Sequence, residues 1–158
     1  MGAGGERVET ARLVLRVLDD REMEALVEGE VDAGLKQAYG EMLEGCRREP
    51  EKRVWHAVWV MELKGGEGDV VGNLSFKGLG EDGRVEVGYG LREGCCGKGY
   101  MTEAVRAMAE WAAVQPGVTR VEAETEAGNE ASRRVLERAG FAATGEVGEE
   151  GPRFVWRG

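Results

Sequence analysis

The stretch Arg92-Glu93-Gly94-Cys95-Cys96-Gly97-Lys98-Gly99-Tyr100-Met101-Thr102-Glu103-Ala104 decides how the rest of the chain is interpreted. It follows an apolar run that predicts a strand over 85–91, and it opens a run whose helical spacing predicts a helix over 101–115. The glycines let backbone N–H groups approach a ligand closely, and the first amides of the helix point toward the same place. A strand, a glycine turn and a helix start together predict an anion site, most often for phosphate.

Two common phosphate-binding motifs do not fit this stretch. A P-loop needs Ser or Thr after the lysine of its motif, whereas Gly99 follows Lys98. A dinucleotide-binding fingerprint needs a third glycine, and Thr102 stands at that place. That fingerprint also belongs on the first strand of a parallel sheet, and here an antiparallel arrangement is expected upstream.

The composition predicts an intracellular globular protein and excludes several function classes. The chain has 158 residues and a net charge of −9, which argues against nucleic-acid binding and fits a cationic partner such as an amine. It has no apolar run that could span a membrane and no signal-peptide pattern, so we expect a cytoplasmic protein. Three cysteines and a single histidine predict reduced thiols and no metal site.

The order of the predicted elements defines an α+β fold with a mixed sheet. Helices are predicted over 22–31, 35–48, 101–115 and 129–139, and Asn129 is the expected N-cap of the last. Strands are predicted over 10–18, 53–63, 70–77, 84–91, 118–125, 141–147 and 153–156, with the fourth and fifth strands parallel. We interpret residues 1–7 as a flexible tail and residues 8–158 as a single domain.

Blocks along almost the whole chain resemble the GNAT family of acetyl-CoA-dependent N-acetyltransferases. They are Glu9-Thr10-Ala11-Arg12-Leu13-Val14-Leu15-Arg16, Val70-Val71-Gly72-Asn73-Leu74, Val85-Glu86-Val87-Gly88-Tyr89, the segment from Gly97 to Ala104, and Asn129-x-x-Ser132 with Gly140-Phe141. Their order is that of the branch with ribosomal-protein N-terminal acetyltransferases. The resemblance implies the GNAT fold: a mostly antiparallel sheet, a splay between the parallel fourth and fifth strands, and helices on both faces.

The resemblance also implies the cofactor site. In this family the glycine loop and the next helix hold the pyrophosphate of CoA, mainly through backbone amides. The cofactor-binding residues it implies are Gly90, Leu91, Arg92, Cys96, Gly97, Lys98, Gly99, Tyr100, Met101, Thr102, Asn129 and Ser132. Cys96 stands where Gln or Arg is usual and Met101 where Gly or Ala is usual, so we expect these two to affect CoA affinity.

Two residues are the predicted catalytic ones. Glu86 alternates with apolar neighbours on the fourth strand, where the family often places a catalytic glutamate, and it is the candidate base, directly or through water. The end of the same strand, Gly90 or Leu91, is the implied oxyanion donor. Leu136 replaces the Tyr that many relatives use as a proton donor, which leaves Ser132 to bind or protonate the thiol or to serve only in packing.

Other polar and aromatic residues are assigned structural roles. We expect Glu122, Glu124 and Glu126 to be solvated or to face substrate charge, and His56 to be a surface or hydrogen-bonded strand residue. Tyr100 is expected to pack at the helix start, and Trp55, Trp59 and Trp111 to lie in the core. Cys96 is not expected to act as a nucleophile, because no base is adjacent and the family transfers the acetyl group directly.

The sequence therefore predicts N-acetyltransfer from acetyl-CoA to a primary amine, with a peptide or protein N-terminal α-amine as the first candidate. A small-molecule amine and a non-catalytic acyl-CoA-binding module are the alternatives. An α-amino group is partly neutral near pH 7, because its pKa of about 7.7–8.0 is far below the pKa of lysine. The acceptor and the oligomeric state stay open.

Overall fold

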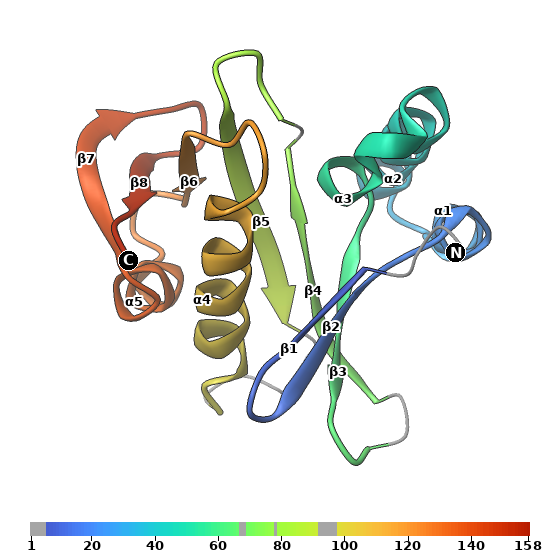
Figure 1. The fold of residues 1–158 in the computed structure, drawn as a ribbon, viewed down its shortest axis with the longest axis horizontal. Helices are drawn as coiled ribbons and strands as arrows, with labels where there is room; N and C mark the ends of the chain where they lie inside the picture. Colours follow the sequence, from blue (N-terminus) through green and yellow to red (C-terminus); the bar gives the residue numbers. More distant parts are fainter. Residues whose placement is uncertain (1–5, 67–68, 78, 92–97) are drawn as a thin grey trace.

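In the part of the chain that the structure describes, one eight-stranded sheet carries helices on both faces (Figure 1). The computed structural model describes residues 6–66, 69–77, 79–91 and 98–158. The elements are β1 (Arg7–Glu9), β2 (Leu13–Val17), α1 (Asp20–Gly29), α2 (Ala33–Arg48), the 3-10 turn η1 (Pro50–Lys52), α3 (Arg53–His56), β3 (Trp59–Leu63), β4 (Val70–Phe76), β5 (Arg84–Leu91), α4 (Tyr100–Ala113), β6 (Arg120–Glu124), α5 (Glu130–Arg138), β7 (Phe141–Val147) and β8 (Pro152–Trp156).

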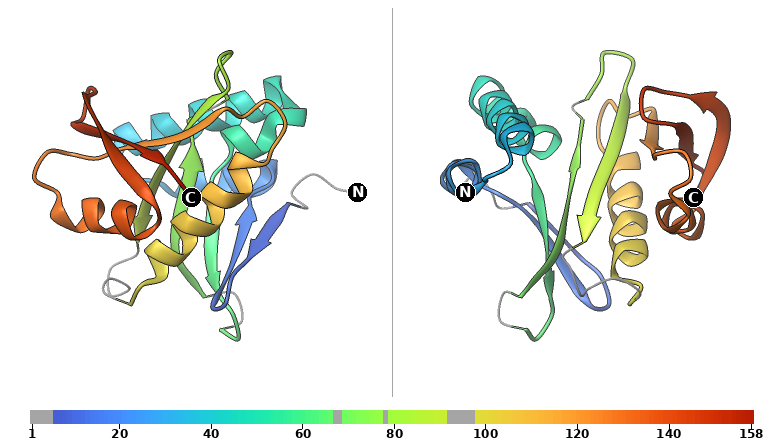
Figure 2. Two further views of the ribbon diagram at one scale, coloured as in Figure 1. Left: turned by 60° about the vertical axis from the view of Figure 1, so that its left-hand side comes forward. Right: turned by 180° about the vertical axis from the view of Figure 1, so that it is seen from behind.

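The sheet order is β1-β2-β3-β4-β5-β6-β8-β7. All neighbouring pairs are antiparallel except β5 and β6, which α4 connects. This confirms the predicted mixed sheet with one parallel pair in its middle. Helix α4 packs on one face, and α1 and α2 lie on the other (Figure 2).

The apolar alternation and the helix caps form as the sequence predicts. Leu13, Leu15 and Val17 are buried on one side of β2. Helix α1 begins after Asp19, whose side chain accepts from the amide of Glu22 in a capping box. The predicted core position of the tryptophans is confirmed, because Trp55 and Trp59 are buried and the partly buried Trp111 of α4 packs against both, tilted to Trp55 and edge-on to Trp59.

Two predicted strands differ from the structure. Residues 10–18 were expected as one strand, but the chain forms a hairpin of β1 and β2, and β1 begins at Arg7, inside the predicted tail. Residues 53–63 were also expected as one strand, whereas η1 and α3 occupy 50–56 and only Trp59–Leu63 is β3. Pro50 at the first position of η1 favours this helical start. Trp55 is buried from α3 against Phe76, so its burial does not need an extended strand.

Neither a membrane-spanning helix nor a metal-binding cluster occurs in the described part of the chain. No helix there is both long enough and apolar enough to cross a bilayer. Likewise, no group of three or more His, Cys, Asp or Glu residues among those residues is arranged to hold a metal ion. Cys46 is buried and has no disulfide partner among the described residues, and burial raises the pKa of its thiol.

Candidate active site

The parallel strands β5 and β6 separate in the middle of the sheet. Their paired residues run from Arg84 opposite Arg120 to Val87 opposite Ala123. Strand β5 continues to Leu91 and stays paired with β4 over this part, as in the pair of Ser75 and Gly88. The second half of β5 therefore has one edge that is not in register with β6. This is the splay that the sequence predicted between the fourth and fifth strands.

The first turn of α4 presents amides that suit an anion. Gly99 is the N-cap, with φ of 79°, and no side-chain hydrogen bond caps the helix. The amide of Glu103 bonds the carbonyl of Gly99, so the amides of Tyr100, Met101 and Thr102 precede the first intrahelical bond. Such amides, together with the helix dipole, favour a phosphate ligand. The geometry thus fits the predicted use of this turn for a diphosphate.

Six of the twelve cofactor residues that the sequence predicts divide into three groups. Lys98 and Gly99 are exposed beside the start of α4. The side chain of Met101 is buried in the core, so this residue can offer a ligand only its backbone amide. Arg92, Cys96 and Gly97 lie outside the described residues.

Ser132 lies next to a tyrosine that the sequence prediction did not include. Asn129 caps α5 by accepting a hydrogen bond from the amide of Ser132 at 3.0 Å. The hydroxyl oxygens of Ser132 and Tyr89 are 2.9 Å apart, and Tyr89 also donates to the Ser132 carbonyl at 3.2 Å. Burial raises the pKa of the Tyr89 phenol and outweighs the opposing effect of the Ser132 hydrogen bond. A hydroxyl pair therefore bridges β5 and α5, whereas Leu136 is fully buried.

Glu86 lies on the opposite face of β5 from Tyr89, because successive strand residues alternate between the two faces. Its carboxylate contacts the Lys77 ammonium at 3.1 Å and the Arg153 guanidinium at 3.1 Å. The two predicted catalytic residues, Glu86 and Ser132, are thus not brought together. Glu86 projects from one face of β5, and Ser132 contacts Tyr89 on the other face.

A network around Arg153 contradicts one prediction for the neighbouring glutamates. Arg153 contacts Glu122 at 2.7 Å and also pairs with Glu124, and the side chains of both glutamates are nearly inaccessible. The hydrogen bond with Glu122 is the main cause that raises the pKa of Arg153. The prediction that Glu122 and Glu124 are solvated is therefore wrong. The sequence showed their common strand face but not the arginine of β8 that pairs with them.

The pairing of β4 and β5 determines which backbone amides face the splay. The amide of Lys77 bonds the carbonyl of Glu86 at 2.9 Å, and the pairs that follow keep this register up to Gly72 and Leu91. Because backbone groups alternate between the two neighbours of a strand, the amide of Gly90 points toward β4. The amide of Leu91 points to the other side, toward the splay. Of the two predicted oxyanion donors, Leu91 is the one with the suitable direction.

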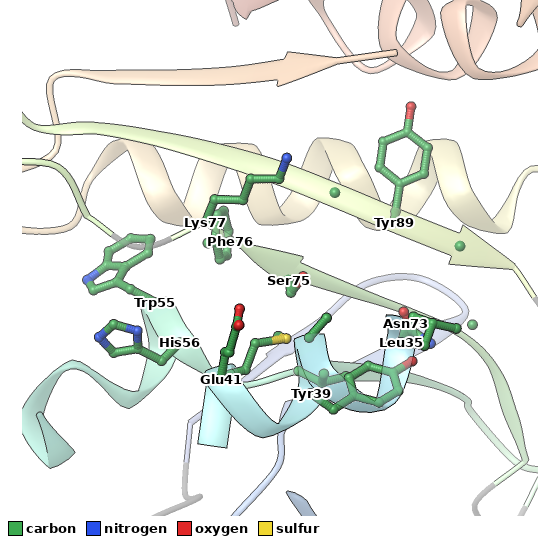
Figure 3. A pocket seen from close by; sticks show the side chains of 16 residues that line it. Leu35, Tyr39, Glu41, Trp55, His56, Asn73, Ser75, Phe76, Lys77 and Tyr89 are labelled. Carbon is green, nitrogen blue, oxygen red and sulfur yellow. The ribbon is translucent and has the colours of Figure 1, made fainter. Parts of the chain in front are cut away.

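A cleft of about 780 Å³ lies between α2 and the β4–β5 pair (Figure 3). We call it the α2 cleft, and it has the size of a small-molecule or peptide-terminus site. Its main lining residues are Leu35, Tyr39, Glu41, Met42, Trp55, His56, Asn73, Ser75, Phe76, Lys77, Gly88, Tyr89 and Gly90. A Cβ atom placed on Gly88 or Gly90 would meet no other atom within 4 Å. Two glycines thus leave bare backbone on the β5 wall, where β5 leaves β6.

His56 lines the same cleft but turns its nitrogens away from it. Its Nε2 is 2.8 Å from Glu49 Oε1, and this hydrogen bond lowers the pKa of Glu49. Its Nδ1 lies against Gly45 of α2, 2.6 Å from where a Cβ of that residue would stand. Both nitrogens are used in packing α3 against the end of α2. This agrees with the prediction of a hydrogen-bonded histidine, although His56 ends a short helix and not a strand.

Comparisons with known proteins agree with this geometry. The family model described as an acetyltransferase (GNAT) domain matches residues 10–142. An uncharacterized N-acetyltransferase of Bacillus subtilis, YjdG, is 32% identical over 84 residues, which are 52% of this chain and 49% of that protein. The matched segment therefore spans about half the length of this relative.

Solved structures share the fold at low sequence identity. The ribosomal-protein α-N-acetyltransferase RimL in complex with coenzyme A has a TM-score of 0.69 and 19% identity, covering 95% of this chain and 94% of that chain. A chimeric spermidine N-acetyltransferase SpeG from Vibrio cholerae has a TM-score of 0.71 and 13% identity, covering 92% of this chain and 95% of that chain. These likenesses extend over nearly the whole domain and concern the fold alone.

Proposed function

This chain belongs to the GNAT acetyltransferase family, and on that premise we propose that it transfers an acetyl group from acetyl-CoA directly to a primary amine, with a peptide N-terminal α-amine as the preferred acceptor. The observation that carries the proposal is the bare glycine wall of β5, which joins the α2 cleft to the splay. An acceptor in the α2 cleft and an acetyl group in the splay would meet at Gly88 and Gly90, where no side chain separates them.

The residues on the two sides of β5 suit different parts of one reaction. Bound acetyl-CoA supplies the activated acetyl group, and the amides of Tyr100, Met101 and Thr102 would hold its diphosphate. Glu86 lies on the same face of β5 as Gly88 and Gly90 and lines a smaller cavity beside the α2 cleft. From there it would accept the proton that the acceptor amine loses, directly or through water. The Leu91 amide would donate to the oxyanion.

The helix side of β5 would serve the leaving thiol. Ser132 and Tyr89 form a hydroxyl pair there, and the Asn129 cap fixes the Ser132 amide. The Ser132 hydroxyl would donate a hydrogen bond to the departing sulfur, which leaves as a thiolate and takes its proton from solvent, and Tyr89 would hold that hydroxyl in place. The thiol has a pKa of about 8.5, so its thiolate is a fair leaving group and needs only modest help from this pair.

The charge of the α2 cleft favours an α-amine over a polycation. Among its described lining residues, Glu41 is the only carboxylate, and Lys77 contributes a positive charge. An acceptor with several positive charges needs more than one carboxylate, whereas a peptide terminus needs one anionic partner and apolar walls. The fold neighbour RimL is by its name a protein α-N-acetyltransferase, which is consistent with such an acceptor.

A small polyamine is a second candidate because of a neighbouring cavity. This cavity has a volume of about 290 Å³ and shares Lys77 with the α2 cleft. It is lined by Lys77, Glu86, Glu124, Gly148, Glu149, Glu150 and Arg153. Its excess of carboxylates suits a cationic tail, and the fold neighbour SpeG is by its name a spermidine N-acetyltransferase.

The experiment that tests the function measures thiol release from acetyl-CoA with a panel of acceptors. The panel contains peptides that begin with Ala or Ser, the same peptides with a blocked N-terminus, and spermidine. We expect turnover with the free peptides and none with the blocked ones, and mass spectrometry places the acetyl group on the α-nitrogen. Preferred turnover of spermidine would favour the second candidate. CoA binding without turnover of any amine would favour the binding module instead.

A further inference from the structure

The turn between β1 and β2 is fastened to the first turn of α4. The Glu103 carboxylate accepts three hydrogen bonds from this turn: from Thr10 Oγ1 at 2.5 Å, from the Arg12 amide at 2.8 Å and from Arg12 Nε at 2.7 Å. The partners are more than ninety positions apart in the sequence. The hairpin end and the start of α4 lie side by side in the views of Figures 1 and 2. We call these three residues the hairpin clamp.

Arg12 extends the clamp to the residues that precede α4. Its Nη1 donates to the Lys98 carbonyl at 2.9 Å, and its guanidinium lies over the Tyr100 ring at 4.6 Å. A Cβ atom placed on Gly99 would stand 3.2 Å from Arg12 Nη2. One side chain therefore touches three consecutive residues at the helix start. A residue with a side chain at position 99 would push Arg12 away and would also strain the positive φ.

Thr10 holds the geometry of the hairpin turn itself. Its Oγ1 accepts from the amide of Leu13 at 3.0 Å while it donates to Glu103. Its own amide donates to the Leu13 carbonyl at 2.9 Å. Buried, multiply hydrogen-bonded charges hold their partners more firmly than exposed ion pairs do. The side chains of Arg12 and Glu103 are 45% and 20% exposed, so the clamp owes its firmness to its three hydrogen bonds and not to burial.

We propose that Arg12, held by Glu103 and Thr10, is a positioning residue that directs the first amides of α4 toward the diphosphate of acetyl-CoA. The proposal rests on the proposed function, because it takes this helix start as the cofactor site. An uncompensated carboxylate in the same turn would repel the diphosphate. Arg12 neutralises Glu103 and fixes Lys98, Gly99 and Tyr100 at the same time.

The clamp also couples the N-terminal hairpin to cofactor binding. If the clamp favours the arrangement that binds CoA, then CoA must favour the clamp by the same factor. The Arg12 amide is a probe for this, because its hydrogen bond with Glu103 must break before it exchanges with solvent. CoA is expected to slow exchange at this amide although the hairpin donates no group to the cofactor in the proposal.

The test compares Glu103→Gln, Arg12→Lys and Thr10→Val with the wild-type chain. We expect an increase of about tenfold in the KM for acetyl-CoA and in the Kd for CoA by calorimetry, with kcat at saturating acetyl-CoA within about twofold. Thr10→Ser keeps the hydroxyl and should keep the wild-type values. Glu110→Gln removes an exposed charge of the same helix outside the clamp and is the matched control.

Two results would overturn the proposal. One is an unchanged Kd for CoA in all three variants, even if their melting temperatures fall, because the clamp would then be only structural. The other is a lower kcat with an unchanged KM. Thr10→Val changes no charge, so it keeps the test possible if Glu103→Gln does not fold. A wild-type chain that binds CoA but acetylates no amine would refute the proposed function, while the Kd comparison would still decide the clamp.

Discussion

Glu86 must change partners before it can act as a base. In the structure its carboxylate is paired with both Lys77 and Arg153. Arg153 is held by two further glutamates, whereas the Lys77 side chain is 60% exposed and free to move into solvent. An incoming ammonium group could therefore take the place of Lys77 beside Glu86. The same exchange would bring the acceptor proton to the carboxylate.

Glu86→Gln tests this role at the level of one residue. We expect kcat at pH 7 to fall by about a hundredfold, because the acceptor must then lose its proton to solvent. The loss should shrink as the pH rises through the pKa of the acceptor amine. Kinetics from pH 6 to 10 measure it, with Glu149→Gln, an exposed residue of the neighbouring cavity, as the control. An unchanged pH profile would make Glu86 a member of the ion-pair network only.

Tyr89→Phe and Ser132→Ala test the hydroxyl pair on the other side of β5. Each variant should lower kcat by about tenfold, because either change removes part of one hydrogen-bonded unit. The double variant should lose no more than the larger single loss. Steady-state kinetics of all four proteins measure this cycle. Additive losses would show that the two hydroxyls act separately.

Residue types alone showed only part of this site. Strand alternation on the sequence places Tyr89 with Val85 and Val87, but it does not say which helix faces that side. The contact with Ser132 joins residues 43 positions apart and depends on how α5 packs. Met101 is a similar case. Helical spacing placed it on the apolar face of the helix, but only the packing shows that its side chain points into the core and not toward the cofactor.

The helices and strands in the second half of the chain were predicted more accurately from the sequence than those in the first half. Strand β5 and the cap of α5 were predicted correctly because each has a strong local signal in alternation, glycine or an Asn cap. The prediction of one strand over residues 53–63 was wrong because the alternation of Trp55, Ala57 and Trp59 is also what a strand would show. The buried position of Trp55 comes from its contacts with α4 and β4, which are tertiary and leave no local pattern.

The glycine wall of β5 leads to a prediction for the element as a whole. In Gly88→Val the new side chain enters open space, and a β-branched residue suits a strand, so the melting temperature should stay within about 2 °C. The same side chain projects into the α2 cleft and covers the bare backbone there, so kcat/KM for the acceptor should fall by about a hundredfold. Gly29→Ala, at the exposed end of α1 and also in open space, is the control. Normal activity of Gly88→Val would contradict the proposal that the acceptor binds in the α2 cleft against β5.

At the scale of the whole molecule, carboxylates join segments that are distant in the sequence. Glu49 ties the end of α2 to α3, Glu103 ties α4 to the hairpin, and Glu124 ties β6 to the turn before β8. Each has a pKa below its ordinary value. The His56 hydrogen bond is the main cause for Glu49, and the Glu150 amide is the main cause for Glu124. Burial alone would raise the pKa of Glu103, but the hydrogen bonds from Thr10 and Arg12 outweigh it.

These shifts predict that the fold loses stability in acid. A carboxylate whose pKa is lowered on folding stabilises the native state above its ordinary pKa, here 4.5, and loses this effect as the pH falls through the lowered value. The melting temperature should therefore be constant near neutral pH and fall steadily below about pH 4.5. Glu103→Gln cannot titrate, so its melting temperature should start lower and approach that of the wild type in acid. Calorimetric scans between pH 3 and 7 measure both curves. Parallel curves would mean that Glu103 titrates alike in the folded and unfolded chain, and the hairpin clamp would then have no ionic character to hold the cofactor site.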